Sequence, residues 1–316
     1  MTSRVLISIV IPVHNEEQNI PLVYEAVREA LKDAPAHDYE FIFVDDGSGD
    51  GSVAAMERLA GTDPRVKILE FVRNFGKEMA TTAGIEAAGG DAVILIDADL
   101  QHPPSLIAEF IQKWEQGAEV VVGIRRSNRG AGLTKRAGSW LFYAITRLIS
   151  QTAMERGETD FRLIDRIVAD AFKNFPERRR TTRFLINWLG FKTARVSFDA
   201  PRRTHGAAQY SFAKLVHLAL YSFISNSLLP LRLAGYLGLT IAILSGILGL
   251  VVFFERYIFN DALSWGISGA AQLAILDVFL IGIVLVALGI MALYIENIHV
   301  EASARPLYVV RKRINF

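Results

Sequence analysis

The chain has 316 residues, of which 51% are hydrophobic and 21% are charged, a composition too apolar for one ordinary soluble domain. Its net charge of +1 gives no overall field that would attract nucleic acid, so no nucleic-acid partner is expected. The absence of cysteine excludes disulfides, thiolate nucleophiles and zinc sites with cysteine ligands, although it does not indicate a compartment.

The first two-thirds of the chain alternates short apolar runs with patterns of helical spacing. The apolar segment at 5–13 is short and is closed by Pro12, so a strand is predicted there rather than a signal peptide. Further strands are predicted at 39–44, 65–72, 91–97 and 118–123, and helices at 20–31, 54–59 and 106–114. This alternation predicts an α/β domain with a mostly parallel sheet and helices on both faces.

Ligands of such sheets bind at the carboxyl ends of the strands, which makes the loops after the strands the places to examine. Charged and amide side chains are concentrated in five loops, at 11–17, 44–52, 73–78, 97–104 and 124–130. The sequence therefore predicts that acidic and basic groups meet at one edge of the sheet.

Asp97, Asp99 and Gln101 occupy alternate positions where the fourth predicted strand ends. In an extended chain this spacing directs the three side chains to one side. Hard oxygen donors of this kind suit Mg²⁺ or Mn²⁺, and such an ion would bridge the protein and a pyrophosphate. The alternative is a polar turn that Pro103 and Pro104 close before a helix.

Two other acidic positions are candidates for contact with a nucleotide. Asp45 follows the second predicted strand and precedes a glycine-rich segment, where a carboxylate binds a ribose hydroxyl or a base edge. The alternative there is a Gly/Ser turn that caps the next helix. Glu16 opens the first long helix, and a cap with an acidic first turn also accounts for it.

Charged residues beyond the fifth predicted strand are candidates for the acceptor side. Arg125 begins a basic stretch that continues to Arg136, which is interpreted either as phosphate binding or as a solvated charged surface. Asp160 lies among apolar residues in TDFRLID at 159–165. It is interpreted either as part of an ion-paired helix start or as a group at the acceptor, where it would act as a base or orient the acceptor.

The composition changes after Leu228. Residues 233–254 carry no charge over a helical length of about 30 Å, and a second apolar run covers 273–295, so two transmembrane helices are predicted. The polar stripe on 212–230 predicts an amphipathic helix in the membrane interface, with packing against the large domain as the competing view. Basic residues before the first span and after the second place both termini in the cytosol, at the inner (plasma) membrane.

The sequences IPVHNEE, VDDGSGDGS, RNFGKE, DADLQHPP and TDFRLID, in this order, resemble those of glycosyltransferase family 2, the inverting GT-A enzymes. The resemblance is greatest to the polyprenyl-phosphate hexose synthase and dolichyl-phosphate mannose synthase group, and it covers essentially the whole chain. It implies a cytosolic GT-A catalytic domain at 1–211, followed by the interfacial helix at 212–230. A membrane domain at 231–316 would hold the two spans and end in a short cytosolic tail.

The resemblance also implies the reaction, which is transfer of a hexose from a nucleotide-sugar to polyprenyl (undecaprenyl) phosphate in the lipid bilayer. The product would be a lipid-linked sugar donor for cell-envelope glycan modification. Glucose from UDP-glucose is the first choice, and mannose from GDP-mannose is the alternative. A non-catalytic membrane scaffold is a further alternative, although Asp97 and Asp99 are both present. A homo-oligomer is left open.

The donor side of the site follows from the same resemblance. Three residues would hold the nucleotide base and ribose, namely Pro12, Glu16 and Asp45. Asp97 would lie near the pyrophosphate, while Asp99 and Gln101 would bind Mg²⁺ or Mn²⁺. These assignments agree with the oxygen donors that the loops themselves supply.

The acceptor side is implied in the same way. Arg125, Arg136 and Arg203 would receive the lipid phosphate, and Asp160 would be the candidate base. The sequence departs from the family pattern at Gln209, where a lysine is often found. This departure removes a cation expected near the phosphates.

Overall fold

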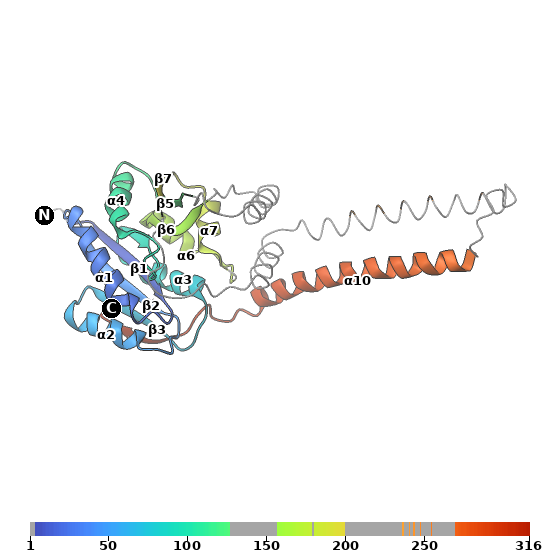
Figure 1. Ribbon diagram of the computed structural model, residues 1–316, viewed down its shortest axis with the longest axis horizontal. Helices are drawn as coiled ribbons and strands as arrows, with labels where there is room; N and C mark the ends of the chain where they lie inside the picture. The colour runs from blue at the N-terminus through green and yellow to red at the C-terminus, as the bar shows by residue number, and fades with distance from the viewer. Residues whose placement is uncertain are drawn as a thin grey trace. The chain divides into compact units, whose positions relative to one another are not determined.

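The computed structural model describes residues 4–126, 157–178, 180–199 and 269–316, together with isolated residues at 236, 240, 243, 247 and 254. The chain divides into two compact units. The first, called the sheet unit here, comprises Met1–Gln209 and Arg305–Phe316, and the second comprises Tyr210–Ala304. The candidate residues that the structure describes all belong to the sheet unit, most of whose strands and helices are labelled in Figure 1.

The sheet unit contains an eight-stranded sheet in the order β7-β5-β6-β4-β1-β2-β3-β8. The strands are β1 (Leu6–Val13), β2 (Asp38–Asp45), β3 (Val66–Phe71), β4 (Ala92–Leu95), β5 (Val120–Arg125), β6 (Glu158–Asp165), β7 (Thr193–Phe198) and β8 (Val310–Ile314). Strands β1 to β4 are parallel, β6 is antiparallel to both β4 and β5, and β8 is antiparallel to β3. The carboxyl ends of β1, β2, β3 and β4 therefore meet at one edge.

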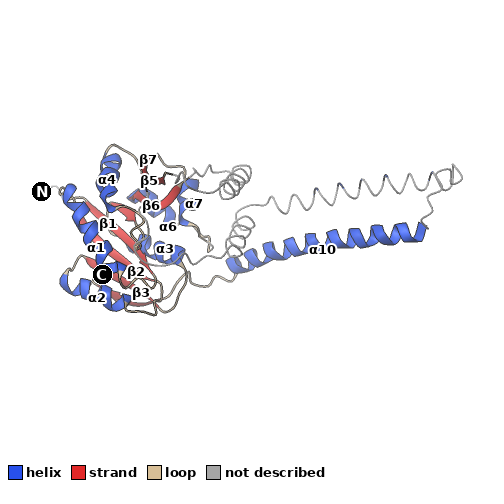
Figure 2. Ribbon diagram, in the orientation of Figure 1, coloured by secondary structure: helices blue, strands red, loops and turns tan. Residues whose placement is uncertain are grey.

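Helices cover both faces of this sheet, as Figure 2 shows. One apolar core joins β1 to α1 (Asn19–Ala30), α2 (Ser52–Thr62) and α4 (Ile107–Glu115). The other joins the opposite sheet face to α3 (Lys77–Ala87), α6 (Arg166–Lys173) and α7 (Thr182–Trp188). Along β1, Ile9 and Ile11 belong to the first core and Val10 to the second, because successive side chains of a strand point to opposite faces. Two short 3₁₀ helices, η1 (Leu31–Asp33) and η2 (Pro104–Leu106), complete these connections.

The segment TDFRLID forms the antiparallel strand β6, so the helix start considered for Asp160 is wrong. The next helix, α6, begins at Arg166, and the Asp165 side chain caps it. Phe161 and Leu163 enter one core, while Ile164 enters the other. Asp160 and Arg162 share the face of Ile164, so two charged residues interrupt the apolar pattern of that face. The predicted strand at 91–97 is also shorter than expected, since β4 ends at Leu95.

The C-terminal residues form an edge strand of the sheet. β8 pairs with β3, and Tyr308, just before it, stacks on Phe71 with ring centroids 5.0 Å apart. Asn315 donates hydrogen bonds to the carbonyls of Ala60 and Val66 at 3.1 and 2.9 Å. The end of the chain, expected to be a short tail, thus covers an edge of β3 that would otherwise expose unpaired backbone groups.

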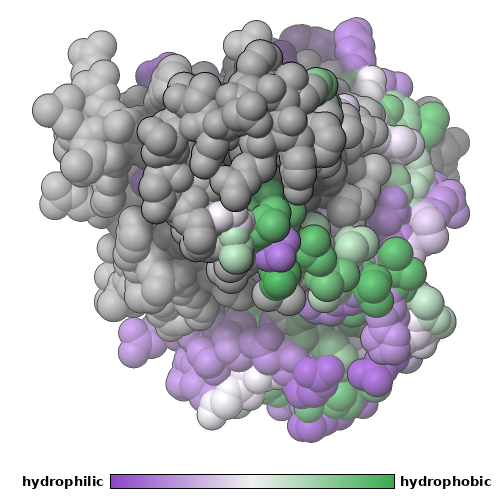
Figure 3. Space-filling view, turned by 90° about the vertical axis from the view of Figure 1, so that its right-hand side faces the viewer, coloured by the Kyte–Doolittle hydropathy of each residue, from purple (hydrophilic) through white to green (hydrophobic). Residues whose placement is uncertain are grey.

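The helix α10 (Gly269–Ala302) belongs to the second unit. Large apolar side chains are exposed along it, among them Leu273, Ile281 and Ile298. Figure 3 colours one face of the molecule by hydropathy, with hydrophobic residues in green. Within the described part of the chain, no helix has both the length and the apolar character needed to cross a membrane. The predicted interfacial helix at 212–230 and most of 233–254 lie outside the described residues.

Candidate active site

A pocket opens at the carboxyl edge of the parallel strands. Its walls come from β1, α3, the loop after β4, β6 and α7, which are far apart in the sequence. The polar and charged residues that line it are Lys77, Glu78, Thr81, Asp97, Asp160, Arg162, Thr182 and Arg183, and Pro12 is also part of the lining. Three predicted site residues, Pro12, Asp97 and Asp160, thus line one pocket.

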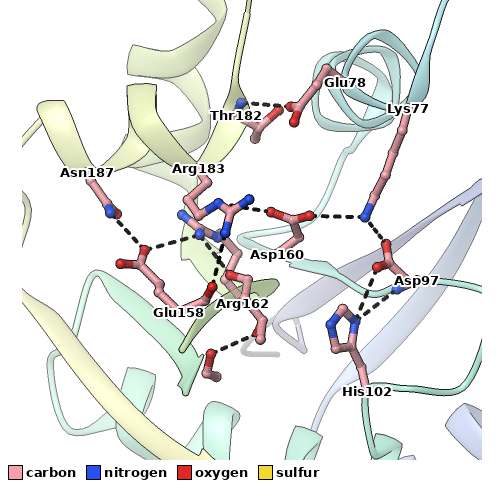
Figure 4. A network of polar contacts seen from close by, with 12 residues as sticks. Lys77, Glu78, Asp97, His102, Glu158, Asp160, Arg162, Thr182, Arg183 and Asn187 are labelled. Carbon is pink, nitrogen blue, oxygen red and sulfur yellow. Dashed lines mark hydrogen bonds and ion pairs between the residues drawn. The ribbon is translucent and has the colours of Figure 1, made fainter. Parts of the chain in front are cut away.

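Lys77 joins the two predicted acidic residues of the pocket (Figure 4). Its ammonium nitrogen lies 2.6 Å from Asp97 Oδ1 and 3.0 Å from Asp160 Oδ2. Burial lowers the pKa of Lys77, but the charges of Asp97 and Asp160 outweigh burial and hold that pKa above its ordinary value. The lysine is therefore positively charged at neutral pH.

Asp160 lies between two cations. In addition to Lys77, the guanidinium of Arg183 approaches it, with Nε 3.4 Å from Oδ1. Burial raises the pKa of Asp160, yet Lys77 and Arg183 outweigh burial and lower the pKa to about 2. A carboxylate with such a pKa is a weak proton acceptor at neutral pH, so its position and charge matter more than its basicity.

The position of Lys77 is fixed by Asp46, the first residue after β2. Asp46 accepts hydrogen bonds from the backbone N–H groups of Phe75 at 2.6 Å and Gly76 at 2.9 Å. Gly76 has φ of +99°, which a glycine adopts without the cost that a side chain would add. The loop after β3 is thereby held so that α3 begins with Lys77 at the pocket.

Asp45 is buried, and one of its two carboxylate oxygens accepts no hydrogen bond from the described residues. Its side chain is 1% exposed, and Oδ2 accepts the Ser48 N–H at 3.1 Å. Oδ1 is buried and has no hydrogen-bond partner among the described residues. Because buried polar atoms are normally satisfied, a ligand hydroxyl or N–H group at this atom fits the predicted contact with ribose or base.

Glu16 has a local structural role. Its carboxylate accepts a hydrogen bond from Asn19 at 2.5 Å, and its backbone N–H donates to Ser52 Oγ at 2.9 Å. The helix-start alternative therefore accounts for one carboxylate oxygen, and the predicted nucleotide contact stays a prediction.

The segment from Asp97 to Gln101 is a turn, so the extended spacing assumed for its side chains is wrong. The strand ends two residues before Asp97, and Leu100 has φ of +58°, in the left-handed region. Asp99 Oδ1 accepts the Gln101 N–H at 3.1 Å, an arrangement typical of aspartate turns. Backbone strain at Leu100 is of the kind that concentrates at functional sites.

His102 packs against the start of this turn. Its ring stacks on Phe161 with centroids 5.3 Å apart, and Nδ1 accepts the Asp97 N–H at 3.4 Å. Burial lowers the pKa of His102 in spite of the nearby carboxylate of Asp97, so the ring is neutral at pH 7. His102 thus positions the backbone of Asp97 and adds no charge.

The donor atoms of this turn fit a divalent cation that shares its ligands with a substrate. Asp97, Asp99 and Gln101 supply carboxylate and amide oxygens, the hard donors that Mg²⁺ and Mn²⁺ prefer. In the described part of the chain, no group of three His, Cys, Asp or Glu residues forms a ready cage. Mg²⁺ is commonly bound by one or two carboxylates together with substrate phosphates and water, which agrees with this sparse set.

Residues 8–185 match the family described as Glycosyl transferase family 2. The glycosyltransferase YkcC of Bacillus subtilis, described as uncharacterized, is 38% identical over 314 residues, which cover 99% of this chain and 95% of that protein. The chain belongs to glycosyltransferase family 2. Bactoprenol glucosyl transferase of Shigella phage SfII is 37% identical over 306 residues, or 97% of each protein.

A solved structure shares the fold of this family 2 glycosyltransferase. Mannosyl-3-phosphoglycerate synthase from Rubrobacter xylanophilus has a TM-score of 0.50 and 19% identity, covering 73% of this chain and 75% of that one. At this identity the likeness shows the fold alone. The sheet unit has the GT-A-like, mostly parallel α/β architecture that was predicted.

The predicted acceptor arginines of the glycosyltransferase are only partly described. Arg125 ends β5, is exposed, and does not line the pocket. Arg136 and Arg203 lie outside the described residues, as does Gln209. Phosphate binding by the three arginines stays a prediction.

Three cationic residues of the pocket were not among the predicted site residues, namely Lys77, Arg162 and Arg183. The sequence contained an indication of Lys77 as a site residue, because RNFGKE follows a predicted strand at the carboxyl edge. It also contained one of Arg162, which lies two residues after Asp160 and so shares a strand face with it. Arg183 comes from α7, an element that the sequence pattern did not predict, and no local motif indicates its proximity to Asp160.

Proposed function

We propose that this glycosyltransferase moves a hexose from a nucleotide-sugar to a polyprenyl phosphate. The observation that carries the proposal is the pocket at the carboxyl edge, where Lys77 joins Asp97 and Asp160 beside further cations. Such a site holds groups that bind phosphates and groups that bind a cation. The relative named bactoprenol glucosyl transferase supports a polyprenyl phosphate as acceptor.

We propose glucose from UDP-glucose as the donor, with mannose from GDP-mannose as the alternative. Oδ1 of Asp45, which has no hydrogen-bond partner among the described residues, supports a nucleotide contact on this side of the site. Pro12 and Glu16 would complete the pocket for base and ribose. The product would be a lipid-linked sugar for cell-envelope glycans.

A divalent cation, Mg²⁺ or Mn²⁺, would be held by Asp99 and Gln101, with Asp97 near the pyrophosphate. When bound, it would offset the charge that develops on the departing nucleoside diphosphate. The acceptor is a phosphate monoester with a second pKa of about 6, so it is largely ionised at pH 7 and attacks without a strong base. Asp160, with its pKa of about 2, would orient the acceptor and would not remove a proton.

Donor and acceptor are tested together with the purified full-length protein, undecaprenyl phosphate and Mn²⁺. Parallel reactions receive labelled UDP-glucose or GDP-mannose, and the organic phase is analysed for labelled lipid. We expect labelled lipid with UDP-glucose and its loss when EDTA is added. Lipid labelling from GDP-mannose alone would select the alternative donor, and labelling from neither would contradict the proposed acceptor.

We further propose that the apolar runs at 233–254 and 273–295 anchor the enzyme in the plasma membrane, with the catalytic domain and both termini in the cytosol. The apolar sequence and the flanking basic residues support this arrangement. The chain has no cysteine, so single reporter cysteines can be labelled without background. In intact cells, an impermeant reagent should label Ser264→Cys, in the predicted outer loop, and not Ser127→Cys. The reverse pattern would contradict the topology.

A further inference from the structure

Lys77 lies where a divalent cation would compete with its ammonium for the Asp97 carboxylate. Its ammonium lies within about 3 Å of an oxygen from each of Asp97 and Asp160 (Figure 4). Asp97 begins the turn that supplies the oxygen donors for Mg²⁺ or Mn²⁺. An ammonium already paired with this carboxylate repels a second cation and reduces the negative charge that would attract one.

The lysine is also placed against the preference of its own helix. It is the first residue of α3, where the helix dipole favours acidic side chains and disfavours cations. The hydrogen bonds from the Phe75 and Gly76 N–H groups to Asp46 hold it there. A cation kept at an unfavourable helix position, directed at two carboxylates, indicates a role in the site rather than in helix stability.

A nucleoside diphosphate would change the balance of charge in this pocket. Its phosphates would supply oxygen ligands to a metal, and their negative charge would offset the repulsion between that metal and Lys77. The protein alone offers few ligands, since no cluster of three His, Cys, Asp or Glu residues is present in the described part. A metal would therefore gain most of its affinity from the diphosphate.

We propose that Lys77 is a tethered counter-cation of the donor site, which holds Asp97 and Asp160 together in the free enzyme and makes metal binding dependent on the nucleoside diphosphate. The proposal rests on the proposed function, because it assumes a nucleotide-sugar donor. Since the coupling of two ligands is reciprocal, the nucleotide and the metal must strengthen each other's binding by the same factor. Removing the ammonium must reduce that factor.

The test measures Mn²⁺ binding to the full-length protein, without turnover, by the electron paramagnetic resonance signal of free Mn²⁺. Titrations are made with no nucleotide, with UDP and with GDP. In the wild type we expect weak Mn²⁺ binding that one of the nucleotides strengthens. In Lys77→Met the repulsion between the ammonium and the metal is lost, so Mn²⁺ should bind at least about tenfold more tightly without nucleotide, equivalent to about 1.4 kcal/mol. The strengthening by nucleotide should fall by a similar factor.

Two variants serve as controls. Lys77→Arg keeps a cation at this position and should retain the weak, nucleotide-dependent binding of the wild type. Lys312→Met removes one positive charge from an exposed pair with Glu57 in the same unit, and should leave Mn²⁺ binding unchanged. Thermal unfolding without metal establishes that each variant is folded.

The outcomes separate this proposal from the function on which it rests. Nucleotide-dependent Mn²⁺ binding that is the same in wild type and Lys77→Met would overturn the counter-cation and leave the donor proposal standing. Weaker Mn²⁺ binding in Lys77→Met would also overturn it. No Mn²⁺ binding by the wild type with either nucleotide would remove the metal-dependent donor site and this proposal together.

Discussion

Replacing Asp97 by asparagine is expected to lower kcat/KM for hexose transfer about a thousandfold while leaving the sheet unit folded. The carboxylate is the shared partner of the Lys77 ammonium at 2.6 Å and lies at the start of the turn that contains Asp99 and Gln101. Loss of a single preorganised electrostatic contact in an active site typically costs about a hundred- to a thousandfold. Asp97 would serve both the cation and the pyrophosphate, so the upper end is expected.

The matched control is Asp91→Asn, which makes the same change at the amino end of β4. Asp91 is exposed and accepts the Leu6 N–H at 2.9 Å, away from the pocket. We expect its activity to stay within about threefold of the wild type, because removal of such a surface charge changes stability by less than about 1 kcal/mol. Activity of Asp97→Asn within tenfold of wild type would contradict the assignment of this carboxylate to the site. Unfolding temperatures of both variants separate loss of chemistry from loss of structure.

The parallel part of the fold could be predicted because its strands are apolar on both faces and end in polar loops. β1 and β2 are nearly fully buried over their central residues, so their sequences consist of almost uninterrupted apolar runs. β8 gives no such signal, since the residues of VRKRI are partly or fully exposed and its partner β3 lies far away in the sequence. Edge strands that depend on distant pairing leave little local pattern.

The same contrast applies to the site. The rule that ligands bind at the carboxyl ends of strands indicated the loops that contain Pro12 and Asp97, and the family resemblance indicated Asp160; all three line one pocket. The rule could not give the pairing of Lys77 with two of them, because that depends on the loop that Asp46 holds. Nor could it show that Asp160 is flanked by Arg183, which lowers its pKa together with Lys77. The sequence therefore indicated the region and not the charge balance within it.

Replacing Arg162 by methionine is expected to have the largest effect on stability, about 3–5 kcal/mol. Arg162 is fully buried, and its Nη2 lies 3.3 Å from Glu158 Oε1 and donates to the Thr159 carbonyl at 3.0 Å. Burial lowers the pKa of Arg162 even though Glu158 and Asp160 favour its charged form. The methionine variant would remove this cation from the buried carboxylate of Glu158, to which the Asn187 amide also donates.

The measurement is urea-induced unfolding of the full-length protein in detergent, for Arg162→Met, Glu158→Gln and the double variant. Breaking a buried pair is costly because one charge stays behind, whereas removing both charges leaves none. The double variant should therefore recover about 2 kcal/mol relative to the sum of the single effects, within the range seen for directly coupled residues. Arg183→Met is the comparison, since its pair with Asp160 is about one-third exposed on both sides and should contribute only about 1 kcal/mol or less. Additive effects of the two single variants would show that Arg162 and Glu158 stabilise β6 independently, and that the buried guanidinium is held by the Thr159 carbonyl rather than by its ion pair.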